Sequence, residues 1–142
     1  MKTSLALAAM LAVLPLTAGA AAGPQVVLGV FEGALPCADC PGVRTRLTLT
    51  QENRDTAEGT YRLEETYLGR DAVPRVTTGD WTTLRGDAVD PDAVVYELNP
   101  DETARSRAFL KVGERAIRQL DRDLREIPAK TGYTLRRVKI KD

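Results

Sequence analysis

The sequence contains no histidine, and this absence removes several kinds of chemistry at once. A serine or cysteine nucleophile needs an imidazole base, so Ser-His-Asp and Cys-His mechanisms are excluded. Zinc sites and type-2 copper sites that depend on imidazole ligands are excluded within this one chain for the same reason. We therefore expect a protein that is not an enzyme and that requires no cofactor.

The sequence also contains few methionine and serine residues, and its net charge is close to zero. The two methionines, Met1 and Met10, lie at the N-terminus, and Ser106 is the only serine beyond residue 22. The 20 basic and 20 acidic side chains balance, and the two signs are interspersed along the chain. Such a surface lacks the basic footprint that nucleic acid or anionic lipid requires, so we expect no nucleic-acid partner.

Residues 1–22 have the pattern of a secretory signal peptide. Lys2 supplies a positive charge, an uncharged apolar run follows, and small residues close the segment. The apolar run is about a dozen residues long, too short to cross roughly 30 Å of hydrocarbon. We predict cleavage after Ala20 or Ala22, with Ala22 preferred, and a mature domain of residues 23–142 in the periplasm.

The only cysteines, Cys37 and Cys40, lie well beyond this predicted cleavage site. A bacterial lipoprotein carries its lipid on a cysteine immediately after the cleavage site. We therefore expect a protein that is not a lipoprotein and has no lipid anchor. We also expect it not to be embedded in the membrane, because no other segment has the length of a membrane-spanning helix.

Apolar and polar residues alternate along most of the remaining chain, which predicts half-buried β-strands. In the run that begins at Val43, every second residue lies on the same face of the predicted strand, and these residues are Val43, Thr45, Leu47 and Leu49. Glu65 falls on the apolar side of the next run, so we expect it to line an interior or lie near a strand end. The candidate strands are Gln25–Glu32, Val43–Thr50, Gly59–Leu68, Arg75–Thr83, Ala93–Asn99, Arg107–Val112, Ala116–Leu120 and Tyr133–Ile140.

Short strands separated by tight turns favour an all-β barrel or sandwich, and closure of a barrel removes exposed strand edges. The charged stretch Asp121–Lys130 is predicted to form a helical turn, limited by Pro128. Five aromatic residues could fill the interior or line a cavity, and a packed interior is the expected state in so small a barrel. They are Tyr61, Tyr67, Trp81, Tyr96 and Phe109.

The pair Cys37 and Cys40 is the one motif with reactive side chains, and three hypotheses about its role remain open. In an oxidising compartment the two residues form a short structural disulfide, which contributes only about 2 kcal/mol by chain entropy. A thioredoxin-like redox site would need a helix after the pair, but Pro41 and the following alternation predict a strand. A Cu(I) site on the two thiolates is the third hypothesis, and it requires a reduced pair.

The motif and its surroundings resemble the N-terminal domain of the NlpE family of bacterial envelope proteins. The resemblance rests on the run from Gly33 to Val43, which contains Leu-Pro-Cys-Ala-Asp-Cys-Pro-Gly. Shorter matches follow in order: Gly59-Thr60-Tyr61, Glu65-Thr66-Tyr67-Leu68-Gly69, Gly79-Asp80-Trp81, Leu120-Asp121 and Tyr133-Thr134-Leu135. The resemblance implies a small antiparallel lipocalin-like β-barrel of about six to eight strands. It also implies a link to copper homeostasis and to envelope-stress signalling through a sensor kinase, with Cys37 and Cys40 as the metal-binding or redox-sensitive pair.

Three functional hypotheses therefore stand at this point. The first is a non-enzymatic periplasmic protein of the NlpE N-terminal type, involved in copper tolerance or envelope-stress sensing through its CxxC loop, with a copper ion or an envelope sensor as partner. The second is a lipocalin-like barrel that binds a small apolar ligand and has a purely structural disulfide. The third is a thiol-disulfide redox protein.

Overall fold

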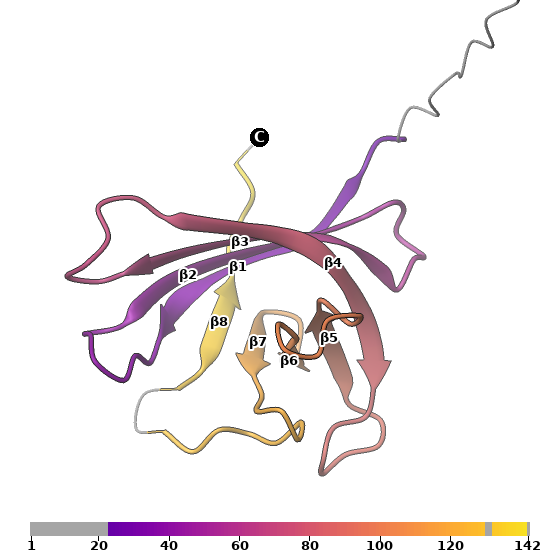
Figure 1. Ribbon diagram of the computed structural model, residues 1–142. Helices are drawn as coiled ribbons and strands as arrows, with labels where there is room; N and C mark the ends of the chain where they lie inside the picture. The colour runs from indigo at the N-terminus through magenta and orange to yellow at the C-terminus, as the bar shows by residue number, and fades with distance from the viewer. Residues whose placement is uncertain (1–22, 130–131, 142) are drawn as a thin grey trace, which may run out of the picture.

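The computed structural model describes residues 23–129 and 132–141, and these residues form one closed antiparallel barrel of eight strands (Figure 1). Each strand pairs with its neighbour in the sequence, and the last strand closes onto the first. The strands are β1 (Val26–Leu35), β2 (Val43–Gln51), β3 (Glu58–Tyr67), β4 (Arg75–Arg85), β5 (Val94–Leu98), β6 (Arg107–Val112), β7 (Ala116–Gln119) and β8 (Thr134–Arg137). The predicted all-β antiparallel barrel is confirmed.

The barrel has two unequal halves. Strands β1–β4 are 9 to 11 residues long and make up the long-stranded half, whereas β5–β8 are 4 to 6 residues long and make up the short-stranded half. Strand β4 belongs to both, because it pairs with β3 from Arg75 to Thr82 and with β5 from Trp81 to Arg85. In Figure 1 it runs across the top of the molecule and bends downward, and β5 lies beside its second part.

The barrel interior is filled by apolar side chains from all eight strands. Trp81 packs its ring edge-on against Tyr96, with the ring centroids 5.6 Å apart, and its Nε1 donates a hydrogen bond of 3.0 Å to the carbonyl oxygen of Thr50. The interior cluster consists of Phe31, Leu35, Leu47, Leu49, Tyr61, Leu63, Trp81, Tyr96, Leu98, Phe109, Ile117 and Leu135. Four of the five aromatic residues that the sequence placed in the barrel interior belong to this packed cluster, whereas Tyr67 is partly exposed and lies beside the Arg75 guanidinium.

A second, smaller apolar cluster lies on the outside of the short-stranded half. Its buried members are Val95, Ala108 and Leu120, and Leu124 packs against them from the connection between β7 and β8. Leu124 has a φ of 57°, and its carbonyl oxygen accepts a hydrogen bond of 3.1 Å from the backbone N–H of Ala88. Two long connections thus meet over this outer cluster and shield it from water.

The helical turn predicted over Asp121–Lys130 is wrong. The side-chain oxygen of Asp121 accepts hydrogen bonds from the N–H groups of Asp123 and Arg125, at 2.8 and 3.0 Å, and an isolated bridge pairs Leu120 with Glu126. This carboxylate takes up the backbone donors locally and so favours a tight turn over a helix. Within residues 23–129 and 132–141, no helix is long and apolar enough to cross a bilayer. The predicted signal peptide, residues 1–22, lies outside the described residues and stays a prediction.

Candidate functional site

The CxxC loop connects β1 to β2 at one end of the barrel, where Leu35 and Val43 are paired and buried. Between these two anchors the chain must reverse direction over a few residues. Cys37 and Cys40 lie in this reversal with their Cα atoms 5.3 Å apart, and a disulfide joins them. Both cysteines are half-buried, so the loop is accessible from solvent although its two ends are fixed in the barrel wall.

The surroundings of the two sulfur atoms are rich in oxygen. The Sγ of Cys37 lies 3.6 Å from Oδ1 of Asp39, and the Sγ of Cys40 lies 3.4 Å from the carbonyl oxygen of Gly42. Across residues 23–129 and 132–141, no group of three or more His, Cys, Asp or Glu side chains is placed to hold a metal ion. Two thiolates, formed by reduction of the disulfide, are therefore the soft-metal ligands that this loop offers.

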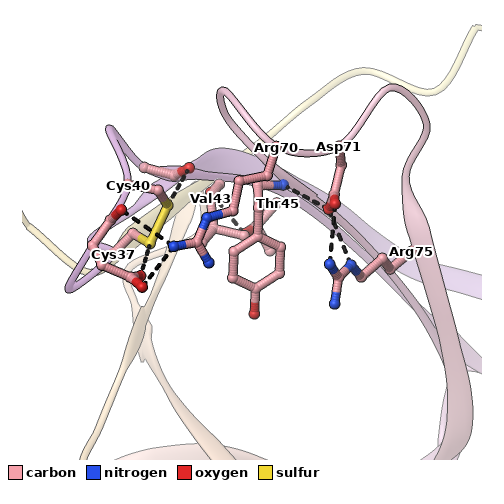
Figure 2. Close-up of a disulfide and its surroundings, with 10 residues drawn as sticks. Cys37, Cys40, Val43, Thr45, Arg70, Asp71 and Arg75 are labelled. Atoms are coloured by element: carbon pink, nitrogen blue, oxygen red, sulfur yellow. Dashed lines mark hydrogen bonds and ion pairs between the residues drawn. A yellow bond between two sulfur atoms is a disulfide. The ribbon is translucent and has the colours of Figure 1, made fainter.

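The CxxC loop is held against the neighbouring connection between β3 and β4. Arg70 forms an ion pair with Asp39, with 2.6 Å between Nη2 and Oδ2, and the N–H of Leu68 donates a hydrogen bond of 3.0 Å to the carbonyl oxygen of Gly42. Figure 2 shows the guanidinium of Arg70 reaching across to the disulfide loop. Two connections far apart in sequence thus form one surface beside the disulfide.

Asp71 organises the second of these connections (Figure 2). One of its carboxylate oxygens accepts a hydrogen bond of 3.1 Å from the backbone N–H of Tyr67, and both face the guanidinium of Arg75 at 3.1 Å. The hydrogen bonds from Arg75 hold the pKa of Asp71 below its ordinary value, and the Tyr67 N–H acts in the same direction. The Arg75 guanidinium lies 4.9 Å from the centre of the Tyr67 ring, so the start of β4 is fixed to the end of β3.

A polar cluster lies inside the barrel near the same end. Glu65, which faces Thr45 in the β2–β3 register, forms an ion pair of 2.8 Å with Arg107 of β6. Arg107 also donates a hydrogen bond of 3.1 Å to the Oε1 of Gln119 and lies 5.6 Å from the centre of the Phe109 ring. The alternation predicted that Glu65 lines the interior or lies near a strand end, and the structure places it inside the barrel. It did not predict Arg107 as the partner, because the two residues lie on strands that are not neighbours.

The structure gives no support for a thioredoxin-like site. Activation of the first cysteine in such a site depends on the N-terminus of a helix that follows the pair. Here β2 begins at Val43, soon after Cys40, so the backbone that follows the pair is extended.

Comparisons with known proteins agree with the sequence motif. A family model described as the NlpE N-terminal domain matches residues 31–130. The protein named Lipoprotein NlpE of Escherichia coli (strain K12) is 30% identical over 107 residues, which cover 74% of this chain and 39% of that protein. This chain therefore corresponds to well under half of the curated relative's length.

Two crystal structures are similar. A Shewanella oneidensis protein described as a lipoprotein has a TM-score of 0.53 at 26% identity, over 79% of this chain and 89% of that one. The structure described as the Cpx pathway activator NlpE from Escherichia coli has a TM-score of 0.47 at 27% identity, over 80% of this chain and 52% of that one. The first of these supports the barrel fold.

These relatives contradict one part of the predicted localisation, namely that the protein is not a lipoprotein. The curated Escherichia coli relative and the Shewanella oneidensis protein are both described as lipoproteins. The prediction rested on the absence of a cysteine close to Ala22, and the class of the relatives overturns it. A missing residue in one short stretch was too narrow a basis for excluding lipid attachment.

Proposed function

Because the chain belongs to the NlpE N-terminal domain family, we propose that it is a non-enzymatic protein of the bacterial cell envelope that senses copper or thiol status through its CxxC loop. The observation that supports this most is the placement of the Cys37–Cys40 disulfide. It lies half-exposed at one end of a barrel whose interior is filled by its own side chains. The loop is therefore the part of the domain that can change chemically while the barrel stays folded.

Envelope-stress signalling is part of the same proposal. The similar Escherichia coli protein is described as an activator of the Cpx pathway. Its sequence relationship to this chain, 30% identity over 107 residues, supports a related role in signalling to an envelope sensor. In this proposal the surface formed by the CxxC loop and the β3–β4 connection is the part that changes when the disulfide is reduced.

Reduction of the loop supplies the chemistry of copper binding. A thiol reductant transfers two electrons to the Cys37–Cys40 disulfide, the S–S bond breaks, and two protons are taken up as the reductant is oxidised to its own disulfide. Binding of Cu(I) then releases those two protons, because thiolates are the ligands that bind the metal. The donor set of the loop suits Cu(I), a soft ion that accepts two sulfur ligands. The oxygen atoms of Asp39 and Gly42 are harder ligands, to which Cu(I) binds poorly.

The test is a competition titration of Cu(I) against a colorimetric chelator, with protein reduced beforehand under anaerobic conditions. We expect the wild-type protein to withdraw one Cu(I) from the chelator, and the double variant Cys37→Ala/Cys40→Ala to withdraw none. Asp39→Asn is the matched control, because it removes the ion pair with Arg70 but keeps both thiols, and it should bind as the wild type does. Equal weak binding by wild type and double variant would remove copper from the proposal.

A further inference from the structure

One stretch of β4 has a neighbouring strand on one side only. Strand β3 pairs with β4 along Arg75–Thr82, whereas β5 begins to pair only at Trp81. Asp80 is already hydrogen-bonded on the β5 side, because the N–H of Asn99 donates a hydrogen bond of 2.8 Å to its carbonyl oxygen. Within the described residues, 75–79 therefore form an open sheet edge of five residues, here called the β4 edge. In Figure 1 this part of β4 crosses the top of the molecule, away from β5.

The hydrogen-bonding direction of each residue in the β4 edge follows from the pairs on either side. The carbonyl of Asp80 points toward the β5 side, whereas the N–H of Thr83 points toward β3, where it donates to Ala57 at 2.8 Å. Backbone N–H and C=O groups of successive residues in a strand point to opposite sides, so those of every second residue point to the same side. Val76 and Thr78 therefore direct their N–H and C=O groups outward from the β4 edge, and Thr77 directs its own toward β3.

We propose that the β4 edge pairs antiparallel with the same edge of a second copy of this chain, about a two-fold axis at Thr77. In this register Val76 of each copy faces Thr78 of the other as a hydrogen-bonded pair, and the two Thr77 residues face each other as a non-hydrogen-bonded pair. All four outward N–H groups then find a carbonyl partner. A two-fold interface must be self-complementary. The proposed register meets this condition, because the outward donors and acceptors of Val76 in one copy face those of Thr78 in the other.

The composition of the β4 edge supports such pairing. Proteins usually protect an open edge with lysine, proline, a bulge or a charged side chain. On β1 the protection is visible, because Arg137 donates a hydrogen bond of 2.7 Å to the carbonyl oxygen of Leu28, next to a register irregularity. Pro74 and Arg75 protect only the N-terminal end of the β4 edge, whereas its central residues 76–78 are Val-Thr-Thr, which are strong strand formers.

Apolar exposure and charge point the same way. The side chain of Val76 is 49% exposed, and Val73 in the adjoining connection is 71% exposed. Arg75, at the end of the edge, is already paired with Asp71, so that its charge is compensated. The predicted mature domain, residues 23–142, has 19 basic and 20 acidic side chains, because Lys2 is the one charged residue of 1–22, and its net charge of −1 gives little repulsion between two copies.

Cross-linking is the direct test. A Thr77→Cys variant places two thiols opposite each other at the proposed axis, where Cα atoms of a non-hydrogen-bonded pair lie about 4.5 Å apart. Thr48→Cys, within β2 and away from the edge, is the matched control. With the native disulfide intact, we expect Thr77→Cys to form a covalent dimer under mild oxidation at least tenfold faster than Thr48→Cys, with a 77–77 linkage by peptide mass spectrometry. Equal rates for the two variants would overturn the proposal.

A second pair of variants tests the backbone hydrogen bonds. Thr78→Pro removes an outward N–H without touching the β3 ladder, a place where strands tolerate proline. Thr78→Ala keeps that N–H. Sedimentation velocity over a concentration series should give a monomer–dimer equilibrium for wild type and Thr78→Ala, with dimerisation about tenfold to a hundredfold weaker for Thr78→Pro, since two hydrogen bonds are lost per dimer. A wild-type protein that stays monomeric up to about 1 mM would contradict the proposal, whatever the stability of the proline variant.

Discussion

The outer faces of the two halves differ: β1–β3 carry charged side chains there, whereas β5 and β6 of the short-stranded half bury apolar side chains on the outside as well as on the inside. On the outside of β1–β3, charged side chains alternate in register, so that Arg46 contacts Glu32 and Glu64, and Arg62 contacts Glu64. On the outside of β5 and β6, the buried side chains are Val95 and Ala108.

The difference follows from strand length. A strand of ten residues makes many ladder hydrogen bonds and interior contacts, and its other face can remain in water. A strand of four or five residues makes few, so that the short-stranded half gains stability from a second apolar layer, worth about 25 cal/mol for each Å² of apolar area buried. Exposed ion pairs of the kind found outside β1–β3 contribute little, typically under about 1 kcal/mol each.

The largest expected effect is at the seam where the two halves meet. Trp81 pairs with both β3 and β5, and its side chain is 2% exposed. We expect Trp81→Ala to lower the free energy of unfolding by about 3–5 kcal/mol, because it empties a large volume between the halves. Urea unfolding followed by circular dichroism measures this. Trp81→Phe, which keeps a ring, should lose less, and a loss below about 2 kcal/mol for the alanine variant would mean that the halves do not depend on each other here.

The second prediction compares the outer faces directly. Leu120 is 3% exposed in the outer cluster, whereas Val76 is 49% exposed on the outside of the long-stranded half. We expect Leu120→Ala to cost about 2–4 kcal/mol of unfolding free energy, and Val76→Ala about 0.5 kcal/mol or less. Both values come from the same denaturation experiment at a protein concentration low enough to favour the monomer. Similar losses in the two variants would contradict the contrast between the two outer faces.

The third prediction concerns the covalent link in the long-stranded half. Replacing Cys37 and Cys40 together by serine should lower the free energy of unfolding by about 2 kcal/mol, because the disulfide closes only a short loop in the unfolded chain. Thermal unfolding under non-reducing conditions is a suitable measurement. Arg70→Ala, which removes only an exposed ion pair to the same loop, should cost about 0.5 kcal/mol or less. A cysteine variant that fails to fold would show that the barrel depends on its loop.

The smallest expected effect is the acid titration of Asp71. Its pKa is lowered in the folded state, chiefly by the hydrogen bonds from Arg75. The carboxylate therefore stabilises the fold above about pH 3.9, the ordinary aspartate value, and this contribution is lost as the pH falls through the lower folded-state pKa. Carbon-detected NMR of the carboxyl group should give a midpoint below the ordinary value. In Arg75→Gln the midpoint should move upward, and an unchanged midpoint would assign the lowered pKa to the Tyr67 N–H instead.

The strands could be predicted because apolar and polar residues alternate wherever a strand has one face in the barrel interior and the other in solvent. The sequence predicted β6 at Arg107–Val112, and the strand has these bounds. The alternation was less informative about where a strand ends, because the end depends on how far the neighbouring strand continues to pair with it. The last strand was predicted to reach Ile140, but it ends at Arg137, because only two residues of β1 pair with it.

The outer cluster and the polar cluster inside the barrel could not be predicted. Each depends on residues brought together by the closed barrel, such as Glu65 and Arg107, which the alternation cannot match across strands that are not neighbours. For the candidate site, the sequence located the cysteines and their strand context. The contact between Asp39 and Arg70 was beyond it, because two connections meet there only after β1–β4 have aligned.

The single tryptophan of the chain has a use that follows from its position. Trp81 is buried, its indole N–H is hydrogen-bonded to a backbone carbonyl, and Tyr96 contacts its ring, so its fluorescence in the native protein should be blue-shifted and insensitive to quenchers in solution. Because the residue touches both halves, its emission is an intrinsic optical reporter of barrel integrity. Reduction of the distant disulfide should leave this signal unchanged, which makes it an internal reference for chemistry confined to the loop.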